Sequence, residues 1–183
     1  MPVVNHMKLH LPLGQALTTL AWGMLEFESA YRAAGQWDIA AATLKRAARY
    51  LIKCHIVASD TALENQFVAQ VDHAYWGRPE QQPERADIVG EAVSAMIAIS
   101  FVLSKNGVQS DWPLAQQLQA RARQLLAFAK AAPGTWAPPY GKNAYPSSAY
   151  QDELTLAQLW MCRLDMATSS TTALSAICLE AVN

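Results

Sequence analysis

Apolar side chains recur every three or four residues along most of the chain, with polar residues between them. This spacing predicts helices, because it gathers the apolar residues on one helix face. We expect helices over residues 17–34, 38–54, 87–105, 111–130 and 151–165, and a sixth over 174–181. The inward positions predicted for the first, second and fourth helices are Leu17, Leu20, Met24, Phe27 and Tyr31; Ile39, Leu44, Ala47, Leu51 and Cys54; and Leu114, Leu118, Ala122, Leu125 and Phe128.

Residues that favour helix ends stand at the borders of these stretches. Asp38, Asp87 and Asp111 are predicted to cap helices, and Gly35 and Gly107 to end them. The third helix is apolar nearly all round, so we expect it to be buried on several sides. Residues 56–86 and 132–149 lack a sustained period and are predicted loops. With no convincing strand, the pattern predicts an all-α protein of antiparallel helix pairs.

Length, composition and charge indicate how many domains the chain forms and which partners it does not bind. A chain of 183 residues with 52% hydrophobic residues is expected to form a single domain. The net charge of −1, with no basic run, argues against nucleic acid. No apolar run reaches the roughly 18 residues of a membrane span, so no membrane is expected.

The amino terminus and the cysteines show neither the pattern of a signal peptide nor that of a metal site. Residues 1–6 lack the charged-then-apolar pattern of a signal peptide, so nothing here predicts export and the compartment stays unknown. Cys54, Cys162 and Cys178 are odd in number and have no metal-like spacing, which favours small apolar core residues.

The most distinctive stretch is residues 72–80, which read Asp-His-Ala-Tyr-Trp-Gly-Arg-Pro-Glu. Gly77 and Pro79 interrupt regular structure, so these residues are predicted to form an ordered loop. Aromatic faces beside hydrogen-bonding groups suit a sugar, whose ring has apolar faces and a hydroxyl rim. The alternative is a buried structural loop, with Trp76 in the core and Arg78 paired to Glu80.

This stretch resembles the loop of family nine glycoside hydrolases, the inverting endo-β-1,4-glucanases (cellulases). Further segments are similar to that family in the same order. They are residues 8–12 (KLHLP) with 17–23 (LTTLAWG), 48–55 (ARYLIKCH), 87–92 (DIVGEA) and 148–154 (SAYQDEL). An ordered series over roughly residues 5–165 is far more specific than one motif alone.

The resemblance implies an (α/α)6 barrel, or toroid, of twelve helices. About six are predicted here, so residues 1–183 are expected to form one partial domain, the amino-terminal half, with no second domain. Half a barrel leaves an apolar helix face without a partner, and burying such surface is favourable. We therefore expect self-association through this seam, or pairing with a complementary half-domain.

Catalysis in the resembled family needs two carboxyl groups. A general acid protonates the leaving oxygen and a carboxylate base activates water, about 6.5–9.5 Å apart. Asn5 stands at the base position, and an amide has no useful basic site. The position of the general acid has no counterpart in this sequence. Asp72 and Glu80 could substitute as the catalytic pair, but the neighbouring His73 and Arg78 would keep both ionised. A general acid instead needs a raised pKa. No catalytic residue is therefore assigned.

The resemblance places a glucan-binding cleft at His73, Trp76, Arg78 and Tyr145. A structural imidazole bonded to a backbone carbonyl is the equal alternative for His73. For Trp76 the alternative of core packing is favoured over a stacking platform. Binding of β-1,4-glucan is therefore expected to be weak or absent.

The resemblance also implies structural calcium at Ser148, Asp152 and Glu153; no cofactor is required. Calcium takes about six to eight oxygens, and at least one family ligand has no counterpart in this sequence. The favoured alternative for Asp152 and Glu153 is the first turn of a helix, where carboxylates complement the dipole.

Three functional hypotheses remain. The chain is an endoglucanase-like fragment that is inactive alone, or a non-catalytic module that binds β-glucan or docks on a partner. Alternatively it is an active enzyme, with reassigned carboxylates or completed by a second polypeptide. The resembled family is usually secreted.

Overall fold

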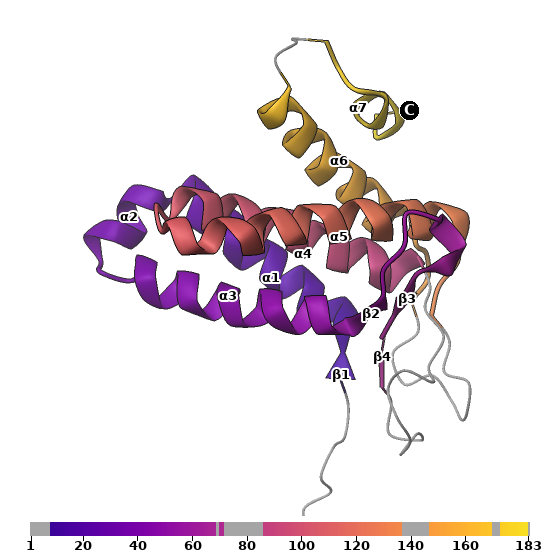
Figure 1. The fold of residues 1–183 in the computed structure, drawn as a ribbon, viewed down its shortest axis with the longest axis horizontal. Coiled ribbons are helices and arrows are strands. Elements are labelled where there is room, and N and C mark those ends of the chain that lie inside the picture. Colours follow the sequence, from indigo (N-terminus) through magenta and orange to yellow (C-terminus); the bar gives the residue numbers. More distant parts are fainter. Residues whose placement is uncertain (1–7, 69, 72–85, 137–146, 170–172, 183) are drawn as a thin grey trace, which may run out of the picture.

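The structure is a computed structural model that describes residues 8–68, 70–71, 86–136, 147–169 and 173–182. In these residues it contains seven α-helices, as Figure 1 shows. They are α1 (His10–Glu26), α2 (Glu28–Ala33), α3 (Trp37–Cys54), α4 (Ala86–Lys105), α5 (Trp112–Ala131), α6 (Gln151–Thr168) and α7 (Ala176–Glu180). The prediction of an all-α fold, a partial toroid of helix pairs, is confirmed.

The helix α4 forms the centre of the fold, packed against α1, α5 and α6 and less extensively against α3. Its residues are buried nearly all round, as its composition predicts. By length and composition alone α4 is long and apolar enough to cross a membrane, although Glu91 interrupts its apolar run. In the structure 94% of its most apolar window is buried inside the fold.

The first predicted helix is divided in two by Phe27, which separates α1 from α2. Leu17 and Met24 are buried as predicted, but Leu20 and Phe27 are 49% and 65% exposed. The buried residues of α1 also include the small or polar residues His10, Gly14, Thr18 and Ala21, and Gly14 lies against Glu91 of α4. The predicted stripe was therefore partly wrong, because close helix contact here uses small residues.

The helices α3 and α5 follow their predicted stripes more closely. Leu44, Leu51 and Cys54 of α3 are buried, while Ile39 is 63% exposed, contrary to prediction. Asp111 is the N-cap residue of α5 and is buried. It accepts a hydrogen bond from Asn106 and pairs with Lys45, which joins the α4–α5 turn to α3.

The expectation of no strand was wrong for four very short segments. β1 (Lys8–Leu9) pairs with β4 (Gln70–Val71), and β2 (His55–Val57) pairs with β3 (Gln66–Phe67). Both pairs are antiparallel. Strands of two or three residues leave no alternating pattern for sequence reasoning to detect.

Two of the cysteines form a bond that the sequence did not predict. Cys162 of α6 and Cys178 of α7 are joined as a disulfide, with Cα atoms 4.8 Å apart. Cys54 is buried, as expected, and takes no part in this disulfide. The interpretation of Cys162 and Cys178 as simple core residues is therefore wrong.

An open groove lies between α1 and the middle of α6. It has a volume of about 640 Å³ and is lined by Thr19, Trp22, Gly23, Glu26, Phe27 and Arg163. Trp22 is 49% exposed and contacts Trp160 edge to face, with ring centroids 6.0 Å apart. We call these lining residues the α1–α6 groove.

Candidate functional site

Two short strand pairs hold the chain before α1, after α3 and before residue 72. β4 ends at Val71, immediately before the 72–80 motif in sequence, and its pairing with β1 ties it to the start of α1. The loop between β2 and β3 is held by Asn65, whose amide donates to the backbone oxygens of Ser59, Thr61 and Ala62.

Glycines bring α1, α4 and α6 unusually close together. A methyl group at Gly14 of α1 would lie 2.7 Å from Cβ of Glu91. One at Gly90 of α4 would lie 2.9 Å from the backbone carbon and oxygen of Glu153. Because these distances are too short for any side chain, the two glycines set the spacing that places the carboxyl groups.

Four acidic side chains gather where α4 and α6 begin: Asp87, Glu91, Asp152 and Glu153. Asp87 accepts hydrogen bonds from the backbone N–H groups of Ile88, at 2.8 Å, and Trp136, at 2.9 Å. It therefore fixes the segment after α5 onto the start of α4. We call these four residues the carboxyl cluster.

Two members of the carboxyl cluster each have a buried oxygen without a hydrogen-bond partner. Glu91 is only 6% exposed, and its Oε2 has no hydrogen-bond partner; Oε2 of Glu153 is likewise buried and unpaired. Burial raises the pKa of Glu91 to about 7, helped by the negative charge of Asp152. The pKa of Glu153 is also raised to about 7, by burial first and then by its hydrogen bond to Asp152. The cluster thus favours protons, or a cation, at neutral pH.

The predicted calcium ligands are only partly brought together. Asp152 and Glu153 occupy the first turn of α6, as the helix-dipole alternative predicts, while Ser148 is exposed in the loop before it. Within the described ranges, no three His, Cys, Asp or Glu side chains form a metal-binding group. The orphaned carboxylate oxygen of Glu153 nevertheless suits a hard cation with additional backbone and water ligands.

The predicted cleft residues His73, Trp76, Arg78 and Tyr145 lie outside the described residues, as does Asn5 at the base position. The same holds for Asp72 and Glu80, weighed as substitute carboxylates. Their roles stay predictions.

Sequence reasoning missed Glu91, Gly90 and Gly14 as parts of this site. The available signal was Glu91 itself, which is the only charged residue between positions 88 and 103. A single acidic residue in so apolar a helix indicates a specific role, because unpaired burial of a carboxylate is costly.

Two buried histidines lie at the ends of α1 and α3. His55 shares a 2.9 Å hydrogen bond with Asn65, and burial lowers its pKa, which favours the neutral ring. His10 stacks on Tyr50, with ring centroids 5.4 Å apart, and its Nε2 lies 3.4 Å from Sγ of Cys54. Both rings pack against Phe67, so they support the β2–β3 loop.

By sequence, the chain is similar to one family of known proteins. The sequence model of glycosyl hydrolase family 9 matches residues 4–178. Endoglucanase 15 of Arabidopsis thaliana is 36% identical over 174 residues, covering 87% of this chain and 34% of that protein. Endoglucanase 24 of Oryza sativa subsp. japonica is 30% identical over 195 residues, covering 96% of this chain and 34% of that protein.

Solved structures give the same result. An endoglucanase from the termite Nasutitermes takasagoensis matches with a TM-score of 0.66 and 31% identity, over 87% of this chain and 39% of that one. The cellulase Cel9M of C. cellulolyticum in complex with cellobiose matches with a TM-score of 0.70 and 26% identity, over 97% and 41%. The chain therefore spans about a third of the length of the curated relatives it matches.

Proposed function

Because the chain belongs to glycosyl hydrolase family 9, we propose that it supplies the β-1,4-glucan-binding part of an endoglucanase-like domain. The family reaction is inverting hydrolysis of β-1,4-glucosidic bonds in cellulose and related glucans. The observation that carries the proposal is the ordered match of residues 4–178 to that family, whose members include a cellulase bound to cellobiose.

We further propose that these residues alone do not hydrolyse glucan. Inversion needs a base that removes a proton from water while an acid protonates the leaving group. An asparagine at position 5 can hold water by hydrogen bonds but cannot accept its proton. The carboxyl cluster does not substitute on its own, since Glu91 and Glu153 have a raised pKa and Glu91 is buried between helices.

Glucan binding is assigned to His73, Trp76, Arg78 and Tyr145. Trp76 would stack on a pyranose face, and His73 and Arg78 would donate hydrogen bonds to hydroxyl groups. The β1–β4 pair supports this assignment, because it holds the chain directly before the motif in a fixed position.

Structural calcium is proposed at Ser148, Asp152 and Glu153. The ion would supply charge compensation to carboxyl groups that otherwise repel one another, and so hold the start of α6 against α4. No catalytic step depends on it.

Two assays test the proposed function. Release of reducing sugar from carboxymethylcellulose is expected to be absent, whereas retardation in a gel containing soluble β-glucan is expected and is weakened by His73→Ala or Trp76→Ala. The matched control is Trp112→Ala, an exposed tryptophan at the start of α5. Sugar release by contaminant-free protein would refute the proposed inactivity, and unretarded wild-type protein would refute the glucan site.

A second candidate function is an interaction module. The α1–α6 groove exposes aromatic rings of Trp22 and Phe27 beside Glu26 and Arg163. Such a surface fits a second copy of this chain or the complementary part of a family 9 domain, which would cover apolar area. Self-association would distinguish this candidate from glucan binding alone.

A further inference from the structure

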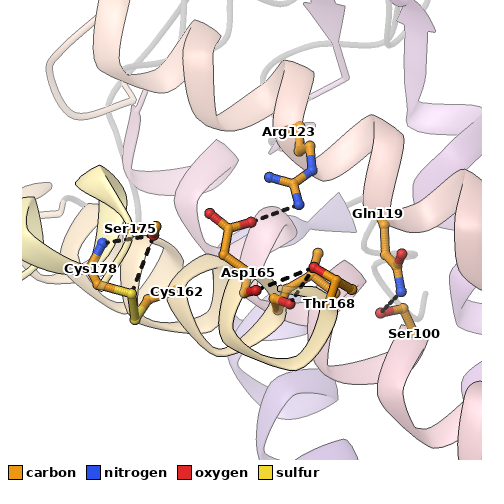
Figure 2. A network of polar contacts seen from close by, with 9 residues as sticks. Ser100, Gln119, Arg123, Cys162, Asp165, Thr168, Ser175 and Cys178 are labelled. Atoms are coloured by element: carbon orange, nitrogen blue, oxygen red, sulfur yellow. Dashed lines mark hydrogen bonds and ion pairs between the residues drawn. A yellow bond between two sulfur atoms is a disulfide. The ribbon is translucent and has the colours of Figure 1, made fainter. Parts of the chain in front are cut away.

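Among the described residues, the short helix α7 meets the rest of the fold mainly through α6. Its five residues, Ala176–Glu180, are too few for a helix to be stable without tertiary contacts. The disulfide between Cys178 and Cys162 joins it to α6, and Glu180 accepts from Lys130 of α5 and Gln158 of α6. Figure 2 shows the disulfide beside the Arg123–Asp165 ion pair, which links α5 to α6.

Packing contributes little where the chain approaches α7. An open hollow of about 370 Å³ separates the end of α6 from the segment that leads into α7, and residues of both line it. Leu174 in that segment is 52% exposed, and Leu179 of α7 is 49% exposed. Ile177 of α7 packs against the core, and the disulfide and the contacts of Glu180 hold the rest of α7 in position.

The two sulfurs of this disulfide differ in their surroundings. Cys178 is 3% exposed, whereas Cys162 is only partly buried. The hydroxyl of Ser175 donates to Sγ of Cys178 at 3.3 Å and accepts from the Cys178 backbone N–H. A hydrogen bond to sulfur stabilises a thiolate, so Cys178 is the better leaving group when Cys162 is attacked.

We propose that the Cys162–Cys178 disulfide is a reducible latch that holds α7 against α5 and α6. A thiolate of an external dithiol attacks Sγ of Cys162 and displaces Cys178 as a thiolate, which then takes up a proton. The second thiolate of the reductant attacks the mixed disulfide and releases Cys162. The reductant leaves as a disulfide, and the protein gains two electrons and two protons. This latch is independent of glucan binding.

Hydrogen exchange of the native protein with and without dithiothreitol tests the latch. Mass spectrometry of the denatured protein first counts the thiols, which must rise from one to three. Amides of residues 177–181 are then expected to exchange at least about tenfold faster, while those of α4 and α5 keep their protection. The double variant Cys162→Ser/Cys178→Ser should reproduce the fast exchange and no longer respond to the reductant.

The outcomes separate a latch from a structural bond. Unchanged exchange in α7 after full reduction would overturn the proposal, as would a disulfide that reacts only under denaturing conditions. Loss of protection throughout the chain would also overturn it. A Ser175→Ala variant is expected to be reduced several-fold more slowly, and Ser175→Thr, which keeps the hydroxyl, should react near the wild-type rate. Equal rates for all three would refute the role of Ser175.

Discussion

Glu91 is buried on α4 where glycines allow α1 and α6 to approach closely. Gly14 approaches its Cβ, Gly90 precedes it, and one carboxylate oxygen has no partner. Its environment therefore favours the protonated, neutral carboxyl group. Substituting Glu91 therefore tests how the carboxyl cluster affects the free energy of unfolding.

The contribution of Glu91 to stability is expected to fall as the pH rises from about 5 to 8. The pKa of Glu91 in the folded chain is raised to about 7, above its ordinary value of 4.5, so the folded state holds the proton more tightly. The favourable contribution is complete below the unfolded pKa and is lost as pH passes through 7. Glu153 acts in the same direction. Urea denaturation across this range measures the effect.

The matched variants are Glu91→Gln and Glu64→Gln. The first is expected to flatten the pH dependence and to be more stable than wild type at pH 8. The second changes an exposed glutamate that bonds Ser59, and should leave the slope unaltered. A free energy of unfolding that changes with pH in the same way in wild type and in Glu91→Gln would contradict the account of Glu91.

Calcium is expected to oppose this loss of stability at neutral pH. A divalent ion at Asp152 and Glu153 favours ionised carboxylates and binds only the folded site, so the melting temperature should rise with its concentration. Isothermal titration with calcium should show uptake in wild type and none in Asp152→Ala. The control Asp165→Ala removes a carboxylate from the other end of α6. No uptake by wild type would exclude the ion.

At the scale of helices, the spacing of α4 and α6 rests on Gly90. A Cβ there would meet the backbone of Glu153, which cannot move without shifting the whole of α6. Gly90→Ala is therefore expected to cost about 1–3 kcal/mol through overpacking, despite a gain of up to about 1 kcal/mol in helix propensity. The midpoint of urea denaturation at constant pH measures the net change in stability.

Gly23→Ala is the matched control within α1. The nearest atom to its added methyl group would be Oη of Tyr31 at 3.9 Å, an ordinary contact. This variant should gain up to about 1 kcal/mol. If both alanine variants gained stability, the close approach of α4 and α6 would not be a constraint.

The helices were predictable where one face meets the core and the other meets water. Leu44 and Leu51 of α3 and Leu118 and Leu125 of α5 follow that rule. In α1 it fails, because close packing on α4 uses Gly14, Thr18 and Ala21 while Leu20 and Phe27 face outward.

The site could be predicted only in part. Asp152 and Glu153 follow from a local motif at the start of a helix. The pairing of Cys162 with Cys178, and the enclosure of Glu91, depend on the angle at which separate helices meet. Sequence spacing carries no record of that angle.

At the scale of the whole molecule, the α1–α6 groove leaves aromatic side chains exposed on the described part of the fold. Phe27 is 65% exposed at one end of it, and Arg163 lies over the Trp160 ring, 5.1 Å from its centroid. Apolar rings beside paired charges are typical of a surface that another helix covers.

Concentration-dependent association is therefore expected in sedimentation velocity experiments. Phe27→Asp should weaken it at least about tenfold, because a buried carboxylate without a partner opposes contact. Leu63→Asp changes an equally exposed residue in the β2–β3 loop and should have no effect. A wild-type monomer at every concentration would contradict self-association.

The enclosure of α4 also has a consequence before the protein is folded. Its residues form one of the longest apolar stretches of the chain, and in the finished fold other helices cover it on nearly every side. α5 and α6 come later in sequence, so on the ribosome α4 emerges before much of its covering exists. Nascent chains at that stage are candidates for chaperone capture, and for aggregation where chaperones are scarce.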